Sequence, residues 1–276
     1  MKRLLNLIKW ATTMGREPQT FLGARWIHGV LKVVPKSRKR LWALRILSLS
    51  PHYFINQNEI GVRETVGSAF LEKMSGILTE SRQTVFDRLL KPHLEPSFAV
   101  IDYGCGPGYL ALAAAQFVRK VYGIDVSAGA LECAGIVNYR ENIRYLIADV
   151  KGPDSIPDQE IDAVYSFAVV QHMTDDAFDH MLSVCHAKLR HGGRLLLHIQ
   201  LPNETWQTQA DWEKNRTLEG QVKYKYGLHC FGRTETEYRT FVQKHGFTQI
   251  TFSPIADLFP ESHDDLTSQR MLVAFK

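Results

Sequence analysis

Three glycines on alternate positions, directly behind an acid and a short apolar run, are the residues of this chain best suited to hold a ligand. They lie in AVIDYGCGPGYLAL, residues 99–112. An apolar strand that enters a tight glycine turn and leaves it as a helix brings backbone close to a ligand, because glycine has no side chain in the way. The loop residues expected to contribute are Asp102, Gly104, Cys105, Gly106 and Gly108.

The spacing of these glycines narrows the kind of ligand. A dinucleotide-binding loop has the pattern G-x-G-x-x-G, which would require glycine at position 109, and that residue is Tyr109. The glycine spacing therefore disfavours a nicotinamide dinucleotide as the ligand of this loop.

Two further acids follow later apolar runs. Asp125 ends the run KVYGID, 21 residues beyond Gly104, and Asp149 follows NIRYLIA. Because the carboxyl ends of parallel strands meet at one edge of a sheet, we expect both acids beside the glycine loop. Asp125 stands where an acid can hold both hydroxyls of a ribose, whereas a dinucleotide site has no need of Asp149.

These segments together resemble a known family. VIDYGCGPGYLAL, VYGIDVS, IRYLIADV, DAVYSFAVVQHM, LRHGGRLLLHI and EYRTFVQKHGF are similar, in order and spacing, to class I S-adenosylmethionine (SAM)-dependent methyltransferases of the small-molecule type, the type 11/25 group. The resemblance covers about residues 80–275. It implies an α/β fold with a Rossmann-like seven-stranded sheet of order 3-2-1-4-5-7-6, the last strand antiparallel and helices on both faces.

The resemblance also implies roles for single residues. The glycine loop would shape the methionine end of SAM. Asp125 would bind the ribose, with Val126 beside the adenine. Asp149 would contact the adenine amino group, with Val150 alongside, and Phe167 would offer its backbone to the methionine amine.

Methyl transfer depends mainly on positioning, but an oxygen or carbon acceptor must also lose a proton to a base. His172, behind the fourth strand in VVQHM, is the first candidate for that base, and His229 is the second. A purely structural role for His172 stays open. His198 lies inside an apolar strand and is expected to be a core histidine.

Some acceptors and a metal centre are not expected. Enzymes that methylate exocyclic base nitrogens or glutamine resemble one another in an Asn/Asp-Pro-Pro-aromatic segment behind the fourth strand, where this chain has AVVQ at residues 168–171. The four cysteines lie far apart without a C-x-x-C pair, which disfavours a zinc site or a disulfide framework and favours a reducing compartment.

The elements that position these residues follow from the pattern. From residue 98 onward, strand-like and helix-like runs alternate, which is typical of a parallel sheet with helices on both faces. Residues 63–91 read as helical, with Ser81 as a cap that begins a second helix at VFDRLL. Thr234-x-x-Glu237 is a capping box.

Charge divides the chain unevenly. Residues 1–50 hold eleven Lys or Arg and one acid, a net charge of +10, so the other 226 residues carry −6. We predict a basic amphipathic helical extension at 1–60 and a methyltransferase domain at 61–276, with an aromatic insert at about 202–232. The extension is interpreted as an anchor to an anionic membrane surface or as a lid packed on the core, and a cleaved organellar presequence is a third, minor alternative.

The expected function is methylation of a small molecule, and a hydroxyl or phenol is the favoured acceptor group. A sugar, a quinone or a lipid-like molecule could each carry that group. The insert aromatics would contact such an acceptor or form a small core of their own. The alternatives are an RNA methyltransferase that uses the basic arm, disfavoured because no RNA-binding module accompanies it, and a non-catalytic SAM-binding protein. A cytoplasmic protein is expected, peripheral to a membrane if the anchor interpretation holds. The oligomeric state is not predicted.

Overall fold

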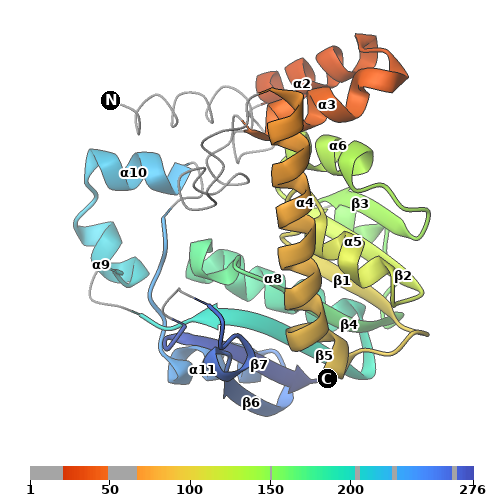
Figure 1. Ribbon diagram of the computed structural model, residues 1–276. Helices are drawn as coiled ribbons and strands as arrows, with labels where there is room; N and C mark the ends of the chain where they lie inside the picture. Colours follow the sequence, from red (N-terminus) through yellow and green to blue (C-terminus); the bar gives the residue numbers. More distant parts are fainter. Residues whose placement is uncertain (1–20, 49–66, 150, 203–205, 226–228, 263–265) are drawn as a thin grey trace.

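A seven-stranded sheet forms the centre of the molecule (Figure 1). The computed structural model describes residues 21–48, 67–149, 151–202, 206–225, 229–262 and 266–276. The strands are β1 (Ala99–Tyr103), β2 (Lys120–Asp125), β3 (Ile143–Ile147), β4 (Ile161–Ser166), β5 (Leu189–Gln200), β6 (Thr248–Pro254) and β7 (Gln269–Phe275). Their order is β3-β2-β1-β4-β5-β7-β6, and β7 runs antiparallel to both of its neighbours, which confirms the expected sheet.

Helices cover both faces of this sheet. The helices are α2 (Phe21–Val33), α3 (Lys36–Ser48), α4 (Ser68–Val85), α5 (Tyr109–Ala115), α6 (Ala128–Val137), α7 (Lys151–Asp154), α8 (Asp175–Lys188), α9 (Gln209–Lys214), α10 (Leu218–Lys225) and α11 (Glu235–Lys244). Val100 points into the core beneath α4 and α5, whereas its neighbour Ile101 points into the core beneath α8 and α11. A strand buried on both faces is apolar at every position, as AVI at the start of β1 is.

The predicted break at Ser81 is wrong. Helix α4 runs unbroken through Ser81 to Val85 and continues into a π-helical turn, Phe86–Leu90, before a short 3-10 turn, Lys91–His93. Neither glycine nor proline lies between Gly76 and Pro92, so nothing in the backbone ends the helix earlier. By contrast, the capping box of Thr234 and Glu237 at the start of α11 is confirmed.

The described part of the basic extension packs against the rest of the chain. Helix α2 ends just before Pro35, as expected, and α3 begins just after it. Together the two helices lie against α4 and α6 (Figure 1). Ile27 and Leu31 of α2 and Leu44 and Leu47 of α3 are buried in an apolar cluster with residues of α4 and α6. This packing is what the lid interpretation requires. Residues 1–20 and 49–66 lie outside the described residues, and the proposed domain boundary near residue 60 lies among them.

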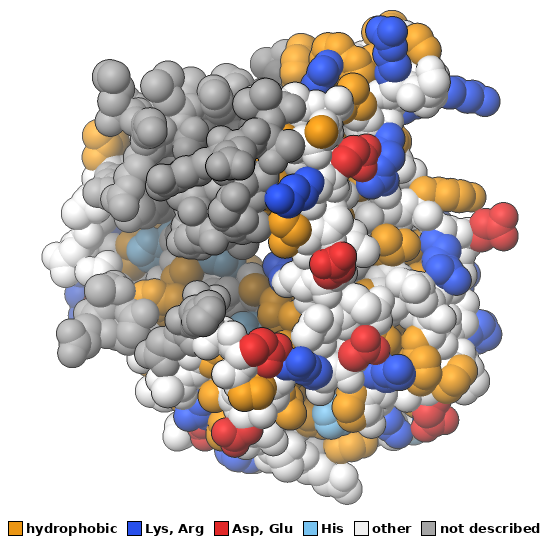
Figure 2. All heavy atoms as spheres, viewed as in Figure 1, with side chains coloured by type: hydrophobic (Ala, Val, Ile, Leu, Met, Phe, Trp, Pro, Cys, Tyr) orange, Lys and Arg blue, Asp and Glu red, His pale blue; other side chains and the backbone are white. Residues whose placement is uncertain are grey.

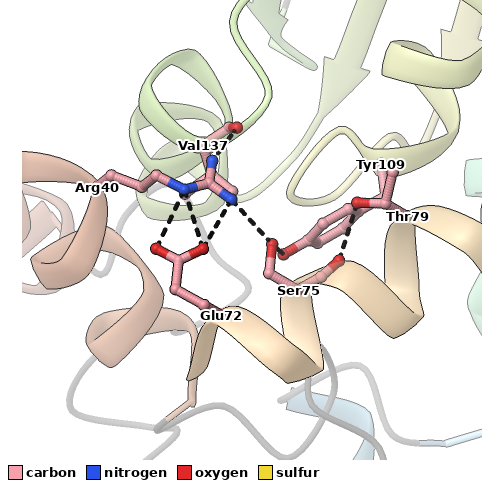
Figure 3. Close-up of polar contacts among 6 residues, drawn as sticks. All are labelled: Arg40, Glu72, Ser75, Thr79, Tyr109 and Val137. Atoms are coloured by element: carbon pink, nitrogen blue, oxygen red, sulfur yellow. Dashed lines mark hydrogen bonds and ion pairs between the residues drawn. The ribbon is translucent and has the colours of Figure 1, made fainter. Parts of the chain in front are cut away.

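One arginine ties α3 to α4 and α6 and, through Ser75, to α5 (Figure 3). The Arg40 guanidinium donates to the Glu72 carboxylate of α4, to the carbonyl of Val137 at the end of α6 and to Ser75 Oγ, at 3.2, 2.8 and 3.3 Å. Ser75 Oγ also lies 3.1 Å from the hydroxyl of Tyr109, the first residue of α5. A polar chain therefore connects the basic extension to the helix that directly follows the glycine loop.

The insert forms a small core of its own. Trp212 of α9 and Phe231 are buried, and their rings lie 5.7 Å apart; the Trp212 ring also lies 4.8 Å from that of Tyr224 and 5.5 Å from that of His229. Of the two interpretations of these aromatics, this packing favours a core under the insert over a stacking surface for a ligand.

Within the described part of the chain, no helix combines the length and the apolar character needed to cross a bilayer.

Candidate cofactor and acceptor site

The glycine loop connects β1 to α5 in a conformation that residues with side chains avoid. Gly104, Gly106 and Gly108 have φ values of 82°, 53° and 80°. A Cβ atom on Gly104 would lie 2.4 Å from Val169 Cγ2, and one on Gly108 would lie 2.2 Å from the Tyr145 hydroxyl. Both the backbone conformation and the close packing therefore require glycine here.

Asp125 holds this loop from the end of β2. Its carboxylate accepts the Gly106 N–H through Oδ2 and the Ser127 N–H through Oδ1, each at 2.8 Å. A carboxylate has about four acceptor positions on its two oxygens, which is the chemistry that two adjacent hydroxyls require.

Asp102 lies in a very different environment at the end of β1. It is 2% exposed, and among the described residues its Oδ2 has no hydrogen-bond partner. Burial, and then the neighbouring charge of Asp125, raise the pKa of Asp102 to about 8, against the Tyr165 hydroxyl and Arg82, which lower it. A buried carboxyl without a full set of partners is suited to meet a cation from a ligand.

The end of β4 is held in a strained turn. Ala168 has a φ of 57°, unusual for a residue with a side chain. Its N–H donates to His198 Nδ1 at 3.2 Å, so His198 must carry its proton on Nε2, which donates to Gln269 Oε1 at 2.8 Å. His198 is therefore the satisfied core histidine that was expected, and burial lowers its pKa. Phe167 stacks 4.5 Å from this imidazole.

Arg82 of α4 is a candidate site residue that the sequence analysis did not predict. Its guanidinium lies 5.3 Å from the centre of the Phe167 ring and close enough to Asp102 to lower the pKa of that carboxyl. Among the described residues its hydrogen bond goes to Ser81 Oγ at 3.3 Å. Burial lowers the pKa of Arg82, and the Asp102 charge raises it. The missed signal was an arginine within an uninterrupted helix that precedes the first strand.

The remaining predicted cofactor residues differ in what the structure says of them. Cys105 is buried in the loop, and burial raises its pKa. Val126 follows Asp125 directly at the end of β2, and Asp149 is exposed two residues beyond β3. Val150 lies outside the described residues.

His172 and His229 are brought together through the ring of the first residue and the main chain of the second. His172 ends a 3-10 turn, Val170–His172, and its Nδ1 lies 2.9 Å from the carbonyl oxygen of His229. A carbonyl cannot donate, so Nδ1 carries the proton, and in the neutral ring Nε2 is then the basic nitrogen. Cys230 Sγ lies 3.5 Å from the same Nδ1. The His229 ring packs against Trp212 and Phe231, so its main chain, rather than its ring, meets His172.

A buried arginine fixes the turn that carries His172. Arg233, which is 3% exposed, donates to the carbonyl oxygens of Val170 and Met173 at 3.2 and 2.6 Å and to Asp175 at 2.7 Å. The Phe231 N–H donates to the carbonyl of Gln171 at 2.7 Å. The insert and the turn behind β4 are therefore one hydrogen-bonded unit.

Figure 2 shows the molecule hollowed to the left of α4, with histidine and hydrophobic side chains in the recess. The described residues contain no cluster of three or more side chains that could hold a metal ion.

Comparison with known proteins identifies the domain. Residues 100–193 match a family model described as a methyltransferase domain. The ribosomal protein L11 methyltransferase of Burkholderia lata is 35% identical over 111 residues, which are 39% of this chain and 34% of that protein. The chain spans 34% to 40% of the length of the first such curated relatives, so the similarity concerns one domain.

Solved structures share the fold at lower identity. A SAM-dependent methyltransferase from Mesorhizobium loti has a TM-score of 0.52 and 18% identity and covers 70% of this chain and 98% of its own. Phosphoethanolamine N-methyltransferase 2 of Haemonchus contortus, solved with SAM, has a TM-score of 0.51 and 16% identity and covers 71% of this chain and 52% of its own. The family model and the shared fold together support a class I SAM-dependent methyltransferase domain in this chain, and SAM is the cofactor of these solved structures.

Proposed function

We propose that this protein transfers the methyl group of SAM to a small-molecule acceptor through a hydroxyl or phenol oxygen. The observation that carries the proposal is the assembly, at the carboxyl ends of β1, β2 and β4, of a glycine loop, two carboxyl groups in contrasting environments and a guanidinium. Ligands of open α/β sheets bind at this edge.

We assign each functional group of SAM to residues at this edge of the sheet. Asp125 is suited to accept from the ribose hydroxyls while it holds the loop. Asp102 offers a buried oxygen without a partner in the described structure to the methionine ammonium, and Arg82 offers donors to the methionine carboxylate. Charge-assisted contacts of this kind are stronger than neutral hydrogen bonds. We propose that Val126, Asp149 and Val150 contact the adenine, as the family resemblance implies.

His172 is our candidate for the base that takes the acceptor proton. The carbonyl of His229 fixes the tautomer in which Nε2 is basic, and Arg233 holds the turn that carries the ring. Bound SAM supplies an electrophilic methyl group on a positively charged sulfur. The role of His172 is then to accept the hydroxyl proton as the oxygen attacks.

The acceptor itself is inferred from this chemistry and not from the relatives. The family model covers residues 100–193, which include the glycine loop, Asp125 and Asp149 but not the insert, so that match does not indicate the acceptor. The aromatic rings of the insert pack against one another. We therefore infer that they stabilise the fold of the insert rather than stack on the acceptor.

Titration calorimetry with SAM tests the proposal. Asp125→Asn should weaken SAM binding by about 10- to 100-fold, since a hydrogen bond to a charged group contributes ~1.5–3 kcal/mol. His172→Gln is the matched control, because a base for the acceptor lies outside the cofactor contacts, and its SAM affinity should be unchanged. Unchanged affinity in a folded Asp125→Asn protein would overturn the site, and absence of SAM binding by the wild type would overturn the function.

A further inference from the structure

The turn between α2 and α3 presents apolar residues surrounded by cations. Val33 is 81% exposed, and Pro35 beside it is also exposed. Lys32, Lys36 and Arg38 flank them, each exposed. An apolar tip of this kind loses favourable burial in water and is a candidate contact surface.

Two partly exposed tryptophans extend this surface along both helices. Trp26 is 49% exposed and lies seven residues before Val33, hence on the same stripe of α2. Trp42 is 36% exposed, with the Arg45 guanidinium 5.2 Å from its ring centre. The amphipathic indole ring favours the boundary between water and hydrocarbon.

The charge of this surface has one sign. Residues 21–48 contain no aspartate or glutamate, and the body of the chain is acidic overall. Arg40 is half-exposed, but its guanidinium is paired with Glu72, so we do not count its charge in this surface. Figure 2 shows hydrophobic and basic side chains gathered over the end of the molecule that α2 and α3 form.

We propose that this surface docks on a bilayer that contains anionic lipid. The hairpin surface consists of Trp26, Lys32, Val33, Pro35, Lys36, Arg38 and Trp42. Its cations would attract acidic headgroups, and Val33 and Pro35 at the tip would enter the membrane interface. A nucleic acid is a poorer partner, because it would place phosphates against these two apolar side chains. The opposite faces of α2 and α3 stay packed on α4 and α6, so docking needs no rearrangement of the body. The inference stands independently of the proposed methyl transfer.

Sedimentation of the full chain with phosphatidylcholine vesicles, with and without phosphatidylglycerol, tests this inference. Binding should require phosphatidylglycerol and weaken as salt is raised. Lys32→Gln with Lys36→Gln should lower partitioning about 25-fold, because each basic residue near an anionic surface contributes ~1 kcal/mol, or about fivefold. Val33→Asp should also weaken binding while the net charge changes by less.

The matched control removes the same charge elsewhere. Lys91 lies beyond the C-terminal end of α4, away from the half of that helix that α3 contacts, and Arg119 lies just before β2. The double variant Lys91→Gln with Arg119→Gln should therefore leave vesicle binding unchanged. Thermal melts establish that each variant folds. Equal binding to neutral vesicles, no binding to any vesicle, retention on nucleic acid alone, or binding that the hairpin variants do not alter would each overturn the inference. SAM affinity, measured in parallel, reports separately on the proposed function.

Discussion

At the scale of single residues, two aspartates at neighbouring strand ends have different roles because their surroundings differ. Asp125 is partly exposed and its carboxylate accepts two backbone N–H groups. Asp102 is buried, and its Oδ2 has no partner among the described residues. The first residue stabilises the loop in its present conformation, whereas the second reduces stability until a cation reaches it.

Asp102→Asn should therefore stabilise the protein in the absence of SAM, and more at pH 8 than at pH 5. The pKa of Asp102 is raised from 3.8 to about 8 in the folded state. Between those values the native state holds a proton that the unfolded chain releases, so the free energy of unfolding of the wild type falls as pH rises. The free energy of unfolding of the variant does not fall in this way. The stabilisation by Asp102→Asn should therefore be larger at pH 8 than at pH 5 by on the order of 3 kcal/mol. Urea denaturation at both pH values measures it, and an equal effect at both would contradict the assignment.

Arg82→Gln should reduce affinity for SAM but not for decarboxylated SAM. If the guanidinium binds the methionine carboxylate, the wild type should prefer SAM over the decarboxylated analogue by about 10-fold or more, and the variant should lose that preference. Arg82→Lys should restore part of it, since it keeps the charge without the planar fork. Calorimetry with both ligands makes the comparison, and a preference that survives in Arg82→Gln would assign the carboxylate to other donors.

At the scale of elements, α3 acts as a clamp over α4, α5 and α6. The pair of Arg40 and Glu72 is about half exposed and by itself contributes little. The guanidinium also satisfies the carbonyl of Val137 at the end of α6, and through Ser75 it reaches Tyr109 at the start of α5. The extension therefore helps to position the helix that follows the glycine loop.

Arg40→Met should destabilise the protein by about 1–2 kcal/mol, because it removes the hydrogen bonds while keeping the apolar stem. Glu72→Gln is the control: it removes the charge of the exposed ion pair and leaves the bond to Val137, so it should cost less than about 0.5 kcal/mol. Urea denaturation compares them. Equal losses would mean that the ion pair, and not the clamp, stabilises α3.

At the scale of the whole molecule, the alternation of apolar runs was enough to predict a parallel sheet with helices on both faces, because such strands are buried on both sides. The order of the strands was predicted from the resemblance to class I methyltransferases. The glycines and acids at the strand ends were predictable because their place along the chain decides the edge at which they meet. The break expected at Ser81 failed because a good cap residue does not end a helix that nothing interrupts.

What sequence alone determined about this protein is therefore local and periodic: the fold, the cofactor loop and the charge of the N-terminal fifth. Tertiary structure decided which neighbours each group meets. It turned His198 into a core residue, joined His172 to the main chain of His229, brought Arg82 to Asp102 and packed one face of the basic helices while leaving the other in water. Burial and pairing depend on residues far apart in the chain, and no spacing along one segment contains that information.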